Sequence, residues 1–114
     1  MGPREDVPAA VVRRLADGDA DALGEVFERE GDRIFRTVRR ICGQDADADD
    51  VTQDAFLRIF AKAHQFRGQS RFTTWMTRVA VSVALNALKK SRRHPTAPLS
   101  AVAEPRAAAD PATD

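Results

Sequence analysis

Apolar residues recur along most of the chain at the spacing of an α-helix. The longest such stretch runs from Asp21 to Cys42, where apolar side chains return every three or four positions and Gly43 follows as the expected C-terminal cap. The same spacing predicts helices over Val7–Ala16, Ala46–Ala63 and Arg71 to about Arg93. No segment alternates convincingly in the manner of a strand. We therefore expect an all-α fold, a compact bundle of about four helices with short connections.

The predicted helix ends carry their own signals. Aspartates at the start of the third helix suit the positive end of a helix dipole. The segment His64–Gln69 contains Gly68 and is interpreted as a loop, and Ser70 is the expected N-cap of the last helix. Pro95 then ends that helix, because proline lacks the backbone N–H that a helix interior needs.

Composition divides the chain into three parts. Residues 1–6 are expected to be a flexible N-terminus, residues 7–94 the helical domain, and residues 95–114 a linker rich in proline and alanine. That last part holds too few large apolar side chains to offset the entropy of ordering it. A single cysteine excludes an internal disulfide, and neither a signal peptide nor an apolar run of about 20 residues is present. These features favour a cytoplasmic protein.

The net charge of +1 conceals a strong segregation of charge along the chain. Residues 1–32 carry four basic and nine acidic side chains, whereas residues 33–43 carry four basic and no acidic ones. Residues 44–54 then carry five acidic and no basic side chains, and residues 55–103 carry nine basic and no acidic ones. Such blocks indicate two different partners, one basic and one acidic.

The predicted third helix presents an apolar residue on its polar side. At about 100° per residue, the face opposite the core gathers Asp50, Asp54 and Leu57, with Gln53 at its edge. An apolar anchor inside a polar ring is what a docking surface for a basic helix would use. The alternative is one scattered surface leucine beside solvated carboxylates, which is common.

The predicted loop combines a ring, cations and groups that form hydrogen bonds. A stacking plane, groups for a base edge and charges for phosphate are what holding an unstacked base requires. The alternative is an ordinary turn between helices with Phe66 packed into the core. The residues of this segment are His64, Gln65, Phe66, Arg67, Gly68, Gln69, Ser70 and Arg71.

The polar face of the last helix is basic, because no carboxylate lies on that helix to neutralise it. It either binds a polyanion or is simply solvated. Trp75 lies at the shoulder of the core stripe, so we expect it to pack rather than to contact a base. The residues on this face are Thr74, Arg78, Ser82, Leu85, Lys89 and Arg92. A second basic stripe either faces DNA or pairs with aspartates of the third helix; it comprises Arg29, Arg33, Arg36 and Arg40.

Two motifs resemble region 2 of sigma factors of the extracytoplasmic-function (ECF) group, in the sigma-70 family. They are DADADDVTQDAFLRIF over residues 45–60 and FRGQSRFTTWMTRVA over residues 66–80. The resemblance implies a helical sigma region 2 fold and a transcription initiation factor. It also implies that a second domain follows in the whole protein, with residues 95–114 as the start of the connection to it.

The resemblance assigns roles to both surfaces. The acidic helix would bind the clamp helices of the β′ subunit of RNA polymerase. The loop of residues 64–71 would capture a flipped base of the promoter minus-ten element on the non-template strand. The last helix would line the same strand and hold phosphates. The implied polymerase contacts are Asp49, Asp50, Gln53, Asp54, Leu57 and Arg58. Beyond the loop, the implied DNA contacts are Thr74, Arg78, Ser82, Lys89, Lys90, Arg92 and Arg93.

Other function classes fit the sequence less well. Cys42, His64 and His94 lack the spacing of a metal site, and no glycine-rich phosphate loop occurs. We therefore expect neither an enzyme nor a cofactor. The alternative within binding functions is an interaction module whose main partner is an anti-sigma factor.

Overall fold

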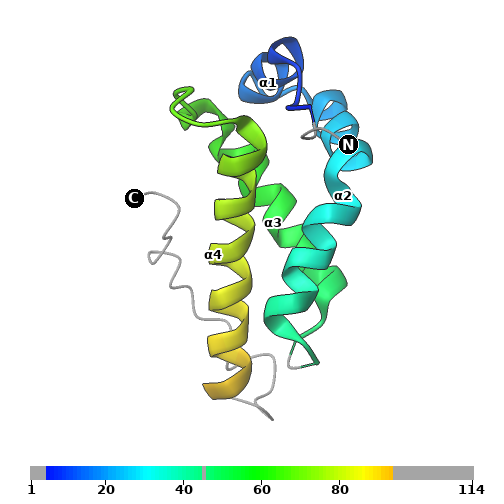
Figure 1. Ribbon diagram of the computed structural model, residues 1–114, viewed down its shortest axis with the longest axis vertical. Helices are drawn as coiled ribbons and strands as arrows, with labels where there is room; N and C mark the ends of the chain where they lie inside the picture. The colour runs from blue at the N-terminus through cyan, green and yellow to red at the C-terminus, as the bar shows by residue number, and fades with distance from the viewer. Residues whose placement is uncertain (1–4, 45, 94–114) are drawn as a thin grey trace.

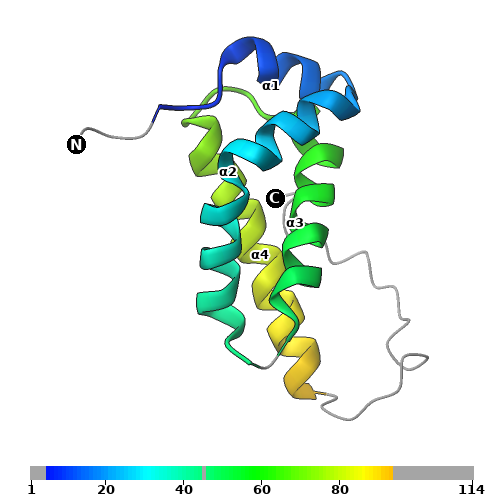
Figure 2. The ribbon, with the colours of Figure 1, turned by 90° about the vertical axis from the view of Figure 1, so that its right-hand side faces the viewer.

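The structure is a computed structural model that describes residues 5–44 and 46–93. These residues form four α-helices and one 3₁₀ turn, and none of them is in a strand. Helices α2, α3 and α4 lie side by side in alternating directions, and α1 lies across the end where α3 meets α4 (Figures 1 and 2). The predicted all-α bundle is therefore confirmed. The elements are α1 (Ala9–Ala16), α2 (Ala20–Cys42), α3 (Ala48–Lys62), η1 (Ala63–Gln65) and α4 (Phe72–Arg93).

Three of the helix ends follow from local hydrogen bonds. The carboxylate of Asp19 accepts the N–H of Asp21 at 2.9 Å and so caps α2. Asp47 caps α3 by accepting the N–H groups of Asp49 at 3.0 Å and Asp50 at 3.4 Å. Gly43 ends α2 with φ 57° and ψ −125°, a backbone conformation that favours glycine, as the sequence predicted.

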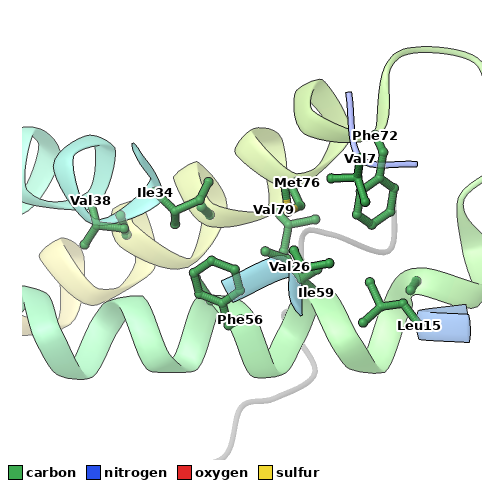
Figure 3. Close-up of a cluster of buried hydrophobic side chains, with 14 of the residues drawn as sticks. Val7, Leu15, Val26, Ile34, Val38, Phe56, Ile59, Phe72, Met76 and Val79 are labelled. Carbon is green, nitrogen blue, oxygen red and sulfur yellow. The ribbon is translucent and has the colours of Figure 1, made fainter. Parts of the chain in front are cut away.

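The apolar core is built on a line of buried residues along α2. Every fourth side chain on that helix is buried, and Ile34 and Val38 belong to the same core as Ile59 of α3 and Met76 of α4 (Figure 3). Leu15 of α1 covers one end of the core and is fully buried. Burying each large apolar side chain contributes about 1.5–3 kcal/mol, so this line sets the register of the bundle. Cys42, at the end of α2, is also buried and its thiol donates to the carbonyl of Ala84 at 3.7 Å.

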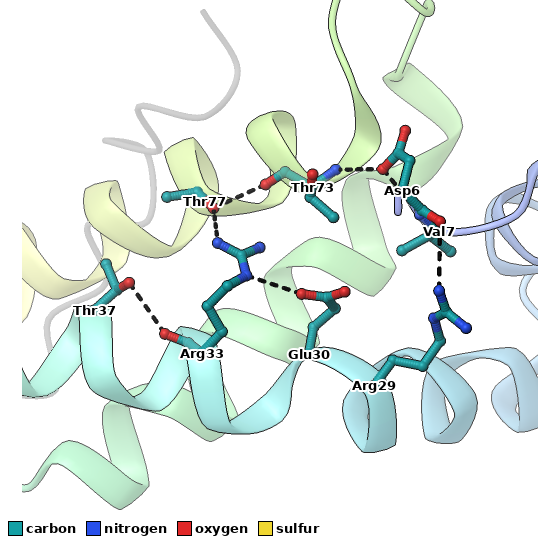
Figure 4. A network of polar contacts seen from close by, with 8 residues as sticks. All are labelled: Asp6, Val7, Arg29, Glu30, Arg33, Thr37, Thr73 and Thr77. Atoms are coloured by element: carbon teal, nitrogen blue, oxygen red, sulfur yellow. Dashed lines mark hydrogen bonds and ion pairs between the residues drawn. The ribbon is translucent and has the colours of Figure 1, made fainter. Parts of the chain in front are cut away.

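One position in this buried line carries a charge. Glu30 is only 1% exposed, and its carboxylate pairs with the guanidinium Nε of Arg33 at 2.9 Å. Arg33 also donates to the hydroxyl of Thr77 on α4 at 3.1 Å, and that hydroxyl donates to the carbonyl of Thr73 at 2.8 Å (Figure 4). The pair therefore links α2 to α4 through a chain of hydrogen bonds within an otherwise apolar interface.

The start of α4 differs from the sequence-based prediction. Ser70 does not cap this helix, because the helix begins at Phe72 and the Ser70 hydroxyl donates to the carbonyl of Arg71 at 3.0 Å. The carboxylate of Asp6 instead accepts the N–H groups of Phe72 at 2.9 Å and Thr73 at 3.0 Å. Asp6, the last residue of the predicted flexible N-terminus, is thus held in the fold. A local reading of the sequence misses a cap that lies 66 residues away.

Two further predictions can be compared only in part. The predicted ends of the domain at His94 and of the linker at residue 114 lie outside the described residues. Within the described ranges, no helix has the length and apolarity needed to cross a membrane.

Candidate functional site

The segment of residues 64–71, here called the α3–α4 loop, lies at the same end of the bundle as α1 (Figures 1 and 2). It begins within the 3₁₀ turn η1, where the N–H of Phe66 donates to the carbonyl of Ala63 at 3.0 Å. Gly68 then adopts φ 79°, which lets the chain turn sharply without the steric cost of a side chain. The loop is therefore a defined turn that places its side chains near α1.

Three aromatic rings anchor this loop. The centroid of the Phe66 ring lies 5.1 Å from that of Phe72 and 5.8 Å from that of Trp75, and the Phe72 and Trp75 rings lie 5.3 Å apart. Phe66 and Trp75 are partly buried against the core, and Phe72 is fully buried. Phe66 is therefore packed, as the plainer alternative held, and it is not a free stacking plane. The expected packing of Trp75 is also seen.

An open groove of about 370 Å³ lies between the loop and the N-terminal part of the chain. The Phe66 ring and Gly68 lie on its loop side, while Arg13 of α1 adds a cation on the other side. This groove, here called the α1–loop groove, is lined by Asp6, Val7, Ala9, Val12, Arg13, Ala16, Ala63, His64, Phe66, Gly68, Ser70 and Phe72.

Polar and cationic side chains follow one another along the α3–α4 loop. His64, Gln65, Arg67, Gln69 and Arg71 are exposed, and Ser70 is partly exposed. Of these, His64 and Ser70 line the groove, together with Arg13 and Asp6, while the exposed arginines belong to the same loop. An aromatic wall with polar groups and cations in the same loop suits a flat, polar ligand that carries negative charge beside it.

The outward face of α4 continues from the loop. The side chains that the sequence placed there are exposed, apart from Ser82, which is partly buried. Leu85, among them, is 45% exposed. Lys90 is exposed on the neighbouring side, and the side chain of Arg93 lies outside what the structure describes. The exposed members are Thr74, Arg78, Leu85, Lys89 and Arg92.

The second basic stripe, on α2, had two alternative roles, and Arg33 follows neither of them. Arg33 pairs with Glu30 on its own helix and with Thr77 on α4, and Arg29 donates to the backbone carbonyl of Asp6 at 3.4 Å. None of these contacts involves an aspartate of α3, and Arg33 is held against α4. Arg29, Arg36 and Arg40 are exposed, whereas Arg33 is partly buried. Glu30 follows the four-residue spacing of the buried line of α2, but its charge argued against burial in the core.

The outward face of α3 matches its predicted pattern. Leu57 is 59% exposed, and Asp50, Gln53 and Asp54 on the same helix are exposed as well. Asp49 is exposed in the first turn, whereas Arg58 is partly buried. An exposed leucine with carboxylates on the same helix face is an arrangement that can seat an apolar, basic partner segment.

Two residues with a place near these surfaces were missed. Asp6 lies too far along the chain from α4 for a local pattern to connect them. Phe27 was counted in the apolar pattern of α2, yet its ring is 50% exposed and packs edge-on against Phe56 of α3 at 5.1 Å. Among the described residues, no group of three or more His, Cys, Asp or Glu side chains is arranged to hold a metal ion.

The family match and the similar proteins of known family agree with one another. The pattern of the Sigma-70 region 2 family matches residues 26–94. The ECF RNA polymerase sigma factor SigM of Mycobacterium tuberculosis is 33% identical over 101 residues, which cover 89% of this chain and 52% of the relative. The ECF RNA polymerase sigma-E factor of Escherichia coli K12 is 33% identical over 93 residues, which cover 81% and 48%.

A more distant relative covers a similar region. The ECF RNA polymerase sigma factor SigW of Bacillus subtilis is 26% identical over 81 residues, which cover 71% of this chain and 43% of the relative. The chain therefore spans about half the length of the curated relatives that it matches.

Proposed function

Because the chain belongs to the Sigma-70 region 2 family, with ECF sigma factors as its relatives, we propose that it is the promoter-opening region of such a factor. In this role it docks on RNA polymerase and holds one strand of the opened minus-ten element. The observations that support this best are the exposed polar and cationic side chains of the α3–α4 loop and the exposed cations that follow it along α4. All of these roles are binding roles, and no catalytic group is needed for them.

The α3–α4 loop captures a base by binding only the open form of the DNA. A flipped base of the non-template strand enters the α1–loop groove, against the wall that Phe66 forms with Gly68. Unstacking a base costs a few kcal/mol, and each stacked or packed base returns about 1–3 kcal/mol. Because the duplex hides its bases, this difference in affinity shifts the equilibrium towards the melted promoter. The packed Phe66 shapes the groove and does not act as a wedge.

The outward face of α4 holds the phosphates of the same strand. Thr74 and Arg78 follow the loop directly, with Ser82 one turn further on, and Lys89, Lys90, Arg92 and Arg93 continue towards the C-terminal end. With about five phosphate contacts to a single strand, affinity should fall on the order of a hundredfold between about 50 and 200 mM salt. This dependence separates the phosphate contribution from base capture, which depends weakly on salt.

The outward face of α3 docks on the polymerase. Leu57 enters an apolar site between basic residues of the β′ clamp helices, and the carboxylates of Asp50 and Asp54 pair with those basic residues. Asp49 and Gln53 extend the contact along the helix, with Arg58 at its edge. An exposed leucine on an acidic helix face supports this assignment.

Fluorescence anisotropy with labelled oligonucleotides tests the DNA role. Single strands scrambled at each position are compared with the matching duplexes at two salt concentrations. We expect tighter binding to one single-stranded sequence, and loss of that preference when residues 66–71 are replaced by a glycine–serine linker. Equal, purely salt-driven binding to every oligonucleotide would reduce the loop to a connector and refute base capture.

A second candidate is an interaction module whose main partner is an anti-sigma factor. Phe27, Leu57 and Leu85 are each about half exposed and lie on three different helices, and exposed apolar side chains can contact a partner protein. A tight complex with a partner protein that does not weaken with salt and that excludes DNA would favour this role for the region.

A further inference from the structure

Asp6 joins three parts of the molecule through one side chain and one carbonyl. Its carboxylate accepts N–H groups from Phe72 at 2.9 Å and Thr73 at 3.0 Å on α4, and from its neighbour Val7 at 2.9 Å. Its backbone carbonyl accepts from the guanidinium of Arg29 on α2 at 3.4 Å (Figure 4). The N–H groups in the first turn of a helix have no partner within the helix, so Asp6 supplies what Ser70 does not.

The position and the charge of Asp6 are both fixed. Val7, the next residue, is 4% exposed and belongs to the core, so the backbone beside Asp6 cannot shift freely. Burial raises the pKa of Asp6, but the hydrogen bonds from Phe72, Thr73 and Val7 and the charge of Arg71 outweigh it and lower the pKa below its usual value. The carboxylate is therefore charged at neutral pH, where it complements the positive end of α4.

This cap lies at the junction between the α3–α4 loop and α4. Phe72 is the first residue of α4, and its ring packs on Phe66 in the loop and on Trp75. Asp6 and Phe72 both line the α1–loop groove. By binding the N–H of Phe72, the carboxylate of Asp6 therefore also fixes the residue whose ring packs on Phe66 of the loop.

We propose that Asp6 is a positioning residue for the α3–α4 loop: it fixes the first turn of α4 and so keeps the aromatic anchor and the α1–loop groove in shape for a base. This inference rests on the proposed function for its consequence in DNA binding. Without the carboxylate, the first turn of α4 frays, Phe72 withdraws from Phe66, and the groove loses one wall. A residue that merely stabilised the bundle would leave the loop unchanged in the folded protein.

The chain offers a matched control. Asp47 caps α3 with the same kind of bond, but it lies at the opposite end of the bundle from the loop (Figures 1 and 2). The full 114-residue chain is therefore compared as wild type, Asp6→Ala, Asp6→Asn and Asp47→Ala. Three quantities are measured under conditions where urea titrations show all four proteins folded. They are amide hydrogen exchange, the emission of Trp75, the only tryptophan, and preference among single-stranded oligonucleotides.

We expect Asp6→Ala to accelerate exchange across residues 64–73 on the order of tenfold and to change the Trp75 emission. It should also lower the preference for the best oligonucleotide over scrambled ones. Asp6→Asn keeps one acceptor oxygen, so its values should fall between those of the wild type and Asp6→Ala. Asp47→Ala should leave the exchange of residues 64–73, the Trp75 emission and the oligonucleotide preference at wild-type values. Equal effects of Asp6→Ala and Asp47→Ala, or an oligonucleotide preference that survives Asp6→Ala, would overturn the proposal.

The two proposals fail in different ways. If the wild type prefers no single strand, base capture fails, and exchange and Trp75 emission alone decide whether Asp6 holds the loop. Unchanged exchange and emission in Asp6→Ala would overturn the positioning role even if the wild type reads DNA.

Discussion

At the scale of single residues, Arg33 takes its role from partners on two helices. The sequence placed it in a basic stripe, yet it pairs with the buried carboxylate of Glu30 at 2.9 Å and reaches Thr77 on α4 at 3.1 Å. Removing one partner of a buried pair leaves a charge that has lost its compensation, which is costly. The role of this arginine is therefore structural, and we expect its replacement to lower the free energy of unfolding.

Replacing Arg33 by methionine should destabilise the protein by about 2–4 kcal/mol, because Glu30 loses its ion pair in a nearly dry site. Arg36→Met, on the exposed side of the same helix, is the control and should cost less than about 0.5 kcal/mol. Urea unfolding followed by circular dichroism measures both. Equal losses in the two variants would contradict the structural role.

The pKa of Asp6 makes a prediction about acid stability. Because the folded-state pKa is lowered, the contribution is fully present above the unfolded pKa of about 3.9 and is lost as the pH falls through the folded value. Below about pH 4, wild-type stability should therefore fall more steeply than that of Asp6→Asn, which cannot titrate at this site. Urea unfolding at a series of acidic pH values checks this, and parallel curves for the two proteins would argue against it. Asp19, whose pKa is also lowered, is present in both and cancels.

At the scale of elements, the helices could be predicted but some of their ends could not. Apolar spacing locates α2 and α3 because periodicity is a local property of the chain, and it also locates the outward Leu57 and Arg78. The cap of α4 joins residues 66 positions apart, and the α1–loop groove joins the N-terminal part of the chain to the α3–α4 loop, which no local pattern relates. The loop side of the candidate site was therefore predicted as a set of residues, but its shape was not.

Replacement by alanine should have opposite effects on stability at Gly24, inside α2, and at Gly43, which ends it. Gly24 lies exposed inside α2 with nothing within 4 Å of an added Cβ, so Gly24→Ala should stabilise the protein by about 0.5–1 kcal/mol. Gly43 has equal space, but its φ of 57° is unfavourable for alanine, so Gly43→Ala should cost about 1–2 kcal/mol. Thermal unfolding of both variants shows whether each replacement raises or lowers stability relative to the wild type. A stabilising Gly43→Ala would mean that α2 ends differently.

At the scale of the whole molecule, the two proposed binding faces belong to different helices. The acidic face with Leu57 lies on α3, and the basic face with Arg78 and Lys89 lies on α4, while α2 and the core join them rigidly. The segregation of charge along the chain thus becomes a segregation in space. A protein built this way can hold a basic protein partner and a nucleic acid at once.

Substitutions on the two faces should therefore act on one partner each. Leu57→Ala should weaken binding to isolated β′ clamp helices by about 1–2 kcal/mol and leave oligonucleotide binding unchanged. The double variant Arg78→Ala, Lys89→Ala should lower the salt dependence of oligonucleotide binding by roughly 0.7 per lost phosphate contact and spare the clamp helices. Calorimetry measures binding to the clamp helices, and fluorescence anisotropy measures binding to the oligonucleotides. An effect of either variant on both partners would show that the faces are not separate.

The buried thiol of Cys42 has a practical consequence. It is the only cysteine of the chain, it is 1% exposed, and it lies where α2 meets α4. A thiol reagent can reach it only when those helices part, so the rate of labelling counts opening events of the native protein. A dye placed through Gln69→Cys on the exposed loop would react far faster than Cys42. The protein can therefore be tagged at the α3–α4 loop without removing its own cysteine.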